Sequence, residues 1–128
     1  MRYLLDTHTF LWFISDDKRL SKTANALMKD RNNALYFSSA SAWEISIKIG
    51  IKRLSIKDEM ESFLLDQLSE NGILPLPITI PHAAYICKLP RIHKDPFDRI
   101  LIAQSVVEDM PLLSRDRTVR KYDANIIW

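Results

Sequence analysis

The 128-residue chain contains one cysteine, Cys87, and only two glycines, Gly50 and Gly72. A single cysteine excludes an internal disulfide and makes a zinc site built from thiolates implausible. Two isolated glycines exclude the glycine-rich turns that bind dinucleotides or nucleoside triphosphates. No apolar run reaches the ~20 residues that cross a bilayer, and the first residues lead into a short apolar segment unlike a signal peptide. These absences predict a cytoplasmic protein that makes no contact with a membrane.

The charge of the chain is nearly balanced. Eighteen Lys and Arg residues face 16 Asp and Glu residues, which gives a net charge of +2, and the sequence pI is about 8.7. The basic residues are spread along the chain, so an anionic partner is permitted but not required. The length suits one hydrophobic core, and no repeat or linker interrupts it. We expect a single domain over residues 1–128.

Short apolar runs alternate with segments of helical periodicity. The runs predict strands at Tyr3–Leu5, Leu35–Phe37, Ile73–Pro77, Pro111–Leu113 and Asn125–Trp128. Helix starts are predicted between them at Ser21, at a Ser41–Glu44 capping box, at Ser55, at Thr79 or Pro81, and at Asp95. This alternation predicts an α/β fold, with a central parallel sheet of four to five strands and helices on both faces.

Four acidic residues fall at one edge of the predicted sheet. Asp6 and Asp116 come just after strands, whereas Glu44 and Asp98 lie in first turns of helices. In parallel sheets the functional edge is the one where strands end and helices begin. Each acid also has a purely structural interpretation: a strand-end turn, a capping box, a helix dipole, or a surface ion pair with Arg117. Their joint placement favours a shared site.

Carboxylates that crowd into one site repel one another unless a cation joins them. Mg²⁺ and Mn²⁺ both prefer oxygen ligands, and ligand type alone does not separate the two ions. Either ion makes water a better nucleophile and offsets negative charge on a phosphate. The chain contains no arrangement that resembles a Ser-His-Asp or Cys-His nucleophile. The substrate that best matches this site is therefore a phosphodiester.

Four stretches resemble, in order and over almost the whole chain, the successive motifs of the PIN-domain family: Leu5–His8, Trp43–Lys48, Asp95–Gln104 and Leu113–Asp116. Within that family they are similar to VapC-type ribonuclease toxins of type II toxin–antitoxin pairs. The resemblance implies a PIN-like three-layer fold and a Mg²⁺- or Mn²⁺-dependent endoribonuclease that acts on RNA. It implies that the catalytic and metal-binding residues are Asp6, Glu44, Asp98 and Asp116. It also implies a homodimer and an antitoxin protein that masks or distorts the site.

Several other residues have two interpretations each. Asp95 fits an N-cap, an outer-shell ligand or a direct ligand, and helix-start chemistry favours the cap. A hydroxyl and three cations are candidates for substrate binding, and turn or surface roles are at least as compatible with them: Thr7, Lys48, Arg99 and Arg115. His93 is predicted to be structural or to face the substrate. Trp12 and Trp43 fit the core first, but a ring left outside suits a partner helix or a stacked RNA base.

Three other functions compete with a nuclease. A phosphatase with an aspartate nucleophile needs a second acid two residues after Asp6, where this chain has His8. A phospho-accepting receiver domain needs an acid pair beside the first strand, and Asp16-Asp17 lies too far downstream. The third is an inactive PIN-like module that only binds RNA or a protein. Such a module has no chemical need to keep four acids together.

Overall fold

The computed structural model describes residues 1–128. Five strands form its single sheet: β1 (Arg2–Leu5), β2 (Ala34–Ser38), β3 (Ile73–Leu76), β4 (Leu112–Leu113) and β5 (Ile126–Ile127). Their order is β3-β2-β1-β4-β5, and every neighbouring pair is parallel. The predicted parallel sheet of four to five strands is therefore confirmed.

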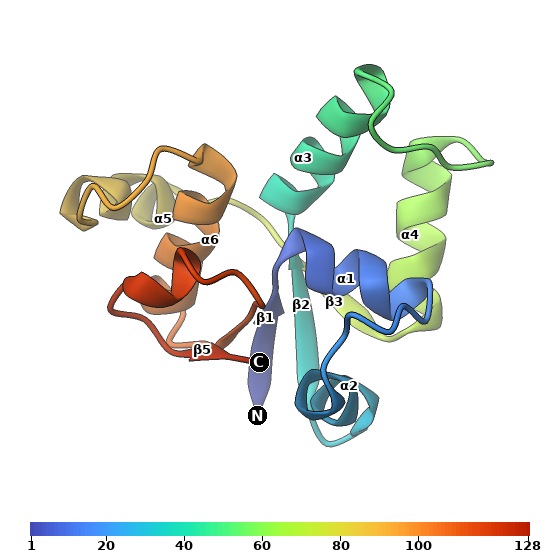
Figure 1. Ribbon diagram of the computed structural model, residues 1–128, viewed down its shortest axis with the longest axis horizontal. Coiled ribbons are helices and arrows are strands. Elements are labelled where there is room, and N and C mark those ends of the chain that lie inside the picture. Colours follow the sequence, from blue (N-terminus) through green and yellow to red (C-terminus); the bar gives the residue numbers. More distant parts are fainter.

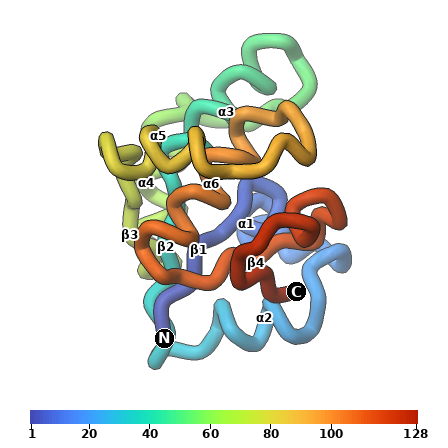
Figure 2. Tube along the Cα trace, turned by 90° about the vertical axis from the view of Figure 1, so that its left-hand side faces the viewer, coloured from blue at the N-terminus to red at the C-terminus, as the bar shows by residue number.

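Helices cover both faces of the sheet. They are α1 (Thr7–Ile14), α2 (Lys22–Lys29), α3 (Ser39–Gly50), α4 (Met60–Glu70), α5 (Ile80–Tyr85) and α6 (Pro96–Val107), with short 3₁₀ turns η1 (Ile86–Lys88) and η2 (Val119–Lys121). α5 and α6 lie on one side of the strands, whereas α1, α2 and α4 lie on the other (Figure 1). Figure 2 shows α5 and α6 crossing in front of the sheet. None of these helices combines the length and hydropathy needed to cross a bilayer.

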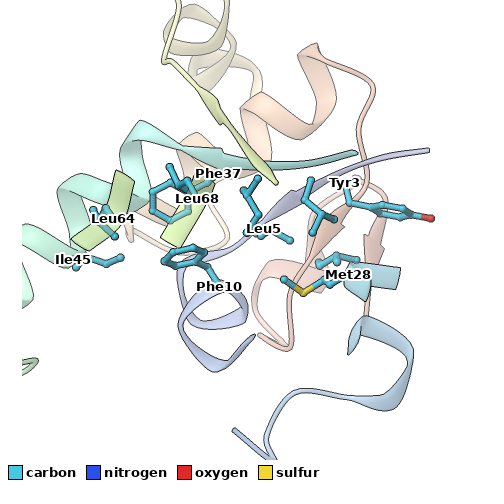
Figure 3. Close-up of a cluster of buried hydrophobic side chains, with 11 residues drawn as sticks. Tyr3, Leu5, Phe10, Met28, Phe37, Ile45, Leu64 and Leu68 are labelled. Atoms are coloured by element: carbon cyan, nitrogen blue, oxygen red, sulfur yellow. The ribbon is translucent and has the colours of Figure 1, made fainter. Parts of the chain in front are cut away.

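β1 is buried on both faces and divides the core in two. Tyr3 and Leu5 point into the larger cluster, and Leu4 points into the smaller one, because successive side chains of a strand face opposite sides of a sheet. The larger cluster packs β1 and β2 against α1, α2 and α4, with Phe10 and Phe37 at a centroid distance of 4.4 Å (Figure 3). The smaller cluster joins the buried face of α6 to β4 and η2.

Local sequence signals set several of the helix ends. The hydroxyl of Ser21 accepts the amide hydrogen of Ala24 and caps α2, as predicted. Asp95 caps α6, and Pro96 occupies its first position, as predicted. Gly72 follows the end of α4 with a φ of +63°. Because side chains disfavour this left-handed conformation, glycine suits the stop at this position.

The predicted Ser41–Glu44 capping box is wrong. α3 begins earlier, and the hydroxyl of Ser38 caps it by accepting the amide hydrogen of Ala40 at 3.0 Å. Ser41 therefore lies inside the helix, where its hydroxyl meets that of Thr7 at 2.9 Å. A contact to another helix, which local spacing does not reveal, determines the role of this serine.

The cap predicted at Ser55 is also wrong. α4 begins at Met60, and the carboxylate of Glu59 accepts the amide hydrogens of Glu61 and Ser62, each at 3.0 Å. These amide hydrogen bonds, led by that from Ser62, lower the pKa of Glu59. An ionised acid at a helix N-terminus is also favoured by the helix dipole. α4 is consequently shorter than the Ser55 signal suggested.

Candidate functional site

β1 lies in the middle of the sheet, where it pairs with β2 on one side and with β4 on the other, so the chain order of the strands runs outward in opposite directions from it. In open parallel sheets the crevice beyond the carboxyl ends of two such strands is the usual ligand position. Asp6 comes directly after β1, Ser114 comes directly after β4, and Asp116 follows two residues later. α1, α3 and α6 all begin at this end of the sheet (Figure 1).

Asp6 is held rigidly at the end of β1. Its side chain caps α1 by accepting the amide hydrogen of Thr9 at 2.9 Å through Oδ1. Its other oxygen, Oδ2, accepts a short hydrogen bond from the hydroxyl of Ser114. Asp6 is 7% exposed, so these two donors replace most of the water that a carboxylate normally binds. They fix the direction in which the carboxylate points.

Ser114 links Asp6 to Asp116. The buried Ser114 hydroxyl, which donates to Asp6, also accepts the amide hydrogen of Asp116 at 3.2 Å. The Asp116 carboxylate is exposed and accepts the amide hydrogens of Thr118 and Val119 at 2.7 and 3.3 Å. Asp116 is thus ordered by its own turn, and its second oxygen has no hydrogen-bond donor from the protein.

Glu44 reaches the same region from α3. Its Oε1 accepts a hydrogen bond of 2.5 Å from the hydroxyl of Thr7, the residue after Asp6. Its Oε2 forms an ion pair of 3.0 Å with Lys48 one turn later. The Glu44 side chain is 14% exposed, so both partners stabilise its charge where water is scarce. Thr7 and Lys48, both predicted to bind substrate, contact this acid.

Asp98, in the first turn of α6, carries the most perturbed carboxyl group of the site. Burial raises its pKa from 3.8 to about 6, while a hydrogen bond from His93 opposes that rise. The negative charges of Asp95 and then Asp116 raise the pKa further. Asp116 therefore lies close enough for its charge to act on Asp98, although the two residues come from different elements. A partly buried carboxyl among like charges is typical of functional sites.

His93 is oriented by a chain of hydrogen bonds. The hydroxyl of Tyr122 accepts a hydrogen bond from Arg99 at 3.1 Å, so its own hydrogen is available to His93 Nδ1 at 2.7 Å. His93 Nε2 then donates to Asp98 Oδ2 at 3.0 Å. Arg99 also donates to the carbonyl of Pro90 at 2.8 Å. Arg99, predicted to bind substrate, thus supports the histidine from within the protein.

Asp95 caps α6 from its exposed position. Its Oδ1 accepts the amide hydrogens of Phe97 at 2.9 Å and Asp98 at 3.3 Å. The cap favoured from the sequence is confirmed. Asp95 also supplies part of the negative charge that raises the pKa of Asp98.

Two cavities open beside these acids. A cavity of about 400 Å³ is lined by Asp6, His8, Trp12, Arg19, Arg115, Asp116 and Arg117. A basic cavity of about 490 Å³ is lined by Arg91, Ile92, His93, Lys94 and Arg99. Among the four substrate-binding candidates, Arg115 is the exposed one and lines the cavity that holds two of the acids.

Sequence reasoning missed Ser114 and Tyr122 as site residues. Ser114 could have been found, because it directly follows a strand at the same sheet edge as Asp6. Tyr122 lies in the second core cluster, and its contact with His93 joins residues 29 positions apart. No local pattern indicates such a contact.

The side chains fit a divalent cation by donor chemistry. In the present arrangement no three His, Cys, Asp or Glu side chains are grouped closely enough to hold one ion. Lys48 pairs with Glu44, and His93 pairs with Asp98. Burial, and after it the negative charges of Asp95 and Asp116, raise the pKa of Asp98. Carboxylate oxygens are the ligands that Mg²⁺ and Mn²⁺ prefer, and either ion would offset that charge.

The motifs, the sheet order and the site geometry agree with one family, and the family model described as "PIN domain" matches residues 3–125. The chain belongs to the PIN-domain family. Among curated PIN-domain relatives, Ribonuclease VapC22 of Mycobacterium tuberculosis (strain ATCC 25618 / H37Rv) is 28% identical over 120 residues, which are 93% of this chain and 90% of that protein. Ribonuclease VapC16 of the same strain is 32% identical over 60 residues, 47% of this chain and 43% of that protein.

Solved structures show the same PIN fold. The crystal structure of VapBC2 from Rickettsia felis, bound to a DNA fragment from its promoter, contains a chain that matches with a TM-score of 0.74 at 17% identity, covering 100% of this chain and 99% of that one. A chain of VapBC-5 from Mycobacterium tuberculosis, described as a member of the VapBC family of toxin–antitoxin systems, matches with a TM-score of 0.60 at 17% identity, covering 98% and 95%. The three-layer fold is therefore that of PIN-domain proteins.

Proposed function

We propose that this PIN-domain protein is a Mg²⁺- or Mn²⁺-dependent endoribonuclease that acts in the cytoplasm as the toxin of a type II toxin–antitoxin pair. The names of its curated relatives, both ribonucleases, support the activity. The toxin–antitoxin complexes among its structural neighbours support the biological role. The observation that carries the proposal is the placement of Asp6 and Asp116 in one cavity, with the half-buried Asp98 within range of the charge on Asp116.

In this proposal four carboxylates hold the cation: Asp6, Glu44, Asp98 and Asp116. The ion supplies Lewis-acid polarisation of the phosphodiester and of the attacking water when it is bound. Ser114 and Thr7 keep the carboxylates of Asp6 and Glu44 in fixed directions through their hydroxyl groups. Fixed ligands matter because a site that needs no reorganisation stabilises developing charge more effectively.

Basic residues complete the proposed site. Arg115 lines the cavity that contains Asp6 and Asp116, and its guanidinium group suits a phosphate oxygen. Lys48 is paired with Glu44 while its side chain is 28% exposed. A cation bound at Glu44 would compete with that pair and free Lys48 to contact the RNA backbone. His93, held by Tyr122, donates a hydrogen bond from its Nε2–H to Asp98 Oδ2.

The geometry of Asp6 disfavours the aspartate-nucleophile phosphatase. A nucleophilic carboxylate needs an oxygen that can approach phosphorus, as in aspartyl-phosphate enzymes. Both oxygens of Asp6 accept hydrogen bonds, and the residue is 7% exposed. A role as a fixed ligand suits this environment better.

We further propose an antitoxin partner and a homodimer. Large apolar side chains remain exposed on α3 and after β3, including Trp43 at 60% and Ile80 at 83%. Exposed apolar groups of this size favour contacts with another protein. The antitoxin complexes among the structural neighbours agree with such a partner.

The decisive experiment is cleavage of RNA by the purified protein with Mg²⁺, with Mn²⁺ and with EDTA. Asp98→Asn should lower the cleavage rate by at least ~100-fold, since it removes one charged ligand from the site. Asp66→Asn is the matched control, because Asp66 is an exposed residue of α4 outside the site. Cleavage that survives both EDTA and Asp98→Asn would refute the metal mechanism. RNA binding without cleavage under every condition would instead indicate an inactive binding module.

A further inference from the structure

One wall of the cavity that holds Asp6 and Asp116 is aromatic and basic. Trp12 of α1 lies in it, with the guanidinium carbons of Arg19 and Arg115 at 5.0 and 5.8 Å from the ring centroid. Flat cations attract the faces of indole rings through the ring quadrupole. The two contacts place guanidinium groups over the indole ring of Trp12.

His8 extends this aromatic wall. It lies four residues before Trp12 on α1, so both side chains project from the same face of the helix. Their ring centroids are 5.7 Å apart, with an angle of 35° between the planes. Trp128 supports Trp12 from another side by an edge contact at 5.9 Å. His8 itself is exposed, so the wall is open to a ligand.

The positive charge of the cavity is available to an anion. Arg115 and Arg117 are exposed, and neither forms an ion pair within the protein. Arg19 is bound to Asp17 at 2.7 Å, which holds the pKa of Asp17 at about 2. The Arg19 side chain is 60% exposed, so it can leave the indole face at little cost while remaining near Asp17.

We propose that this cavity binds one nucleotide of single-stranded RNA, with its base stacked on Trp12 beside His8 and its phosphate held by Arg115 and Arg117. The nucleotide would lie next to the phosphodiester that meets Asp6 and Asp116, so the cavity would position the strand for cleavage. This inference rests on the proposed ribonuclease function. Aromatic faces combined with exposed arginines are the usual means by which proteins hold unpaired bases and their backbone.

An acidic peptide is the competing ligand, because three arginines would also attract carboxylates. The aromatic pair favours RNA: a peptide carboxylate uses the guanidinium groups but needs no flat apolar surface. A nucleotide uses both features, because its phosphate binds the guanidinium groups and its base stacks on the flat apolar surface. The two ligands therefore differ in whether the indole of Trp12 takes part.

The direct test uses the metal-free protein and follows the indole N–H signals of its three tryptophans by NMR. Adenosine 5′-monophosphate should shift the signal of Trp12, with a smaller shift at Trp128 and none at Trp43. Ribose 5-phosphate, which has the phosphate but no base, should leave the Trp12 signal nearly unmoved. Equal shifts by the two probes, or no shift at Trp12, would overturn the proposal. This readout does not depend on cleavage, so it separates failure of the nucleotide site from failure of the ribonuclease assignment.

The kinetic test compares variants on a short single-stranded RNA. Trp12→Leu should raise KM by about ten-fold, the effect of losing one stacked base, with kcat nearly unchanged. Trp12→Phe keeps an aromatic face and should restore most of the affinity. Leu65→Ala, at an exposed apolar residue of α4 outside the cavity, should leave both constants unchanged. Wild-type KM in Trp12→Leu would contradict base stacking.

Arg117→Ala gives an independent check in case Trp12→Leu fails to fold, because Arg117 is exposed. It should weaken binding of RNA and reduce the salt dependence of that binding by about one phosphate contact. Arg31→Ala, at an exposed position before β2, is the matched control. If both alanine variants bind RNA with the same affinity and salt dependence, the phosphate role of Arg117 is refuted.

Discussion

Replacing Asp98 with asparagine removes the carboxyl whose pKa burial raises to about 6, and so changes how the stability of the metal-free protein depends on pH. The unfolded chain exposes this carboxyl to water, where its pKa is near 3.8. The folded protein therefore binds the Asp98 proton more tightly than the unfolded chain does. Consequently the free energy of unfolding of the wild type falls as pH rises from about 4 to about 6.

The size of this effect follows from the pKa difference. About two units between 3.8 and 6 correspond to roughly 3 kcal/mol, at 1.36 kcal/mol per unit. The Asp98 side chain is 21% exposed, so partial solvation lowers the expected penalty to about 1–3 kcal/mol. The penalty is absent below the unfolded pKa, where both states are protonated, and complete above about pH 6.

The assay is chemical denaturation in EDTA at a series of pH values on either side of this window. The stability of Asp98→Asn relative to wild type should increase by about 1–3 kcal/mol between the acid and the neutral end. Asp66→Asn should show no such trend. Mg²⁺ should stabilise the wild type at neutral pH more than Asp98→Asn, since the ion binds only the folded site. If the difference in stability between Asp98→Asn and the wild type does not change with pH, the burial penalty on the Asp98 carboxylate is refuted.

Three further predictions follow from the site. Ser114→Ala should lower the free energy of unfolding by about 1–3 kcal/mol and reduce the cleavage rate at least ~10-fold, because Asp6 loses a buried hydrogen-bond donor. The control is Ser105→Ala, which removes a buried hydrogen bond to Met110 and should lower stability without changing cleavage by the folded protein. His93→Ala should raise the pKa of Asp98 above about 6, by up to roughly one unit, in a carboxyl ¹³C NMR titration in EDTA; a lower pKa would contradict the hydrogen bond. Sedimentation should give a mass of about 30 kDa, twice 14.9 kDa, and a mass of one chain would refute the homodimer.

The sequence predicted those parts of the fold that depend on local chemistry. The Asp95–Pro96 helix start, the Ser21 cap and the stop at Gly72 each follow from the conformational preference or hydrogen bonding of one residue. Strand ends placed Asp6 at the correct sheet edge, because parallel strands end together. Ser38, and not the predicted Ser41, caps α3, whereas Ser41 lies inside the helix and contacts Thr7 of α1. Spacing along the chain does not contain that information.

The contacts that support the site could not be predicted from the sequence either, because they join residues that are far apart along the chain. Ser114 and Asp6 are 108 positions apart, and the hydroxyl of Tyr122 reaches His93 from a turn near the end of the chain. Arg99, a candidate for substrate binding, has its guanidinium group hydrogen-bonded to the carbonyl of Pro90 and to the hydroxyl of Tyr122. The contact between Arg99 and Tyr122, the residue after η2, forms only once the chain is folded.

The two outer strands limit how the molecule can join others. β3 carries Pro75 and is followed by Pro77, and β5 has only two residues, Ile126 and Ile127. A proline has no amide hydrogen to share with an incoming strand, and a two-residue strand offers too short a template. Extension of the sheet from molecule to molecule is therefore blocked at both borders. Any stable assembly must therefore form through helices and side chains, which protects the protein from edge-to-edge aggregation of its sheet. The exposed apolar surfaces of its helices remain available to a partner protein.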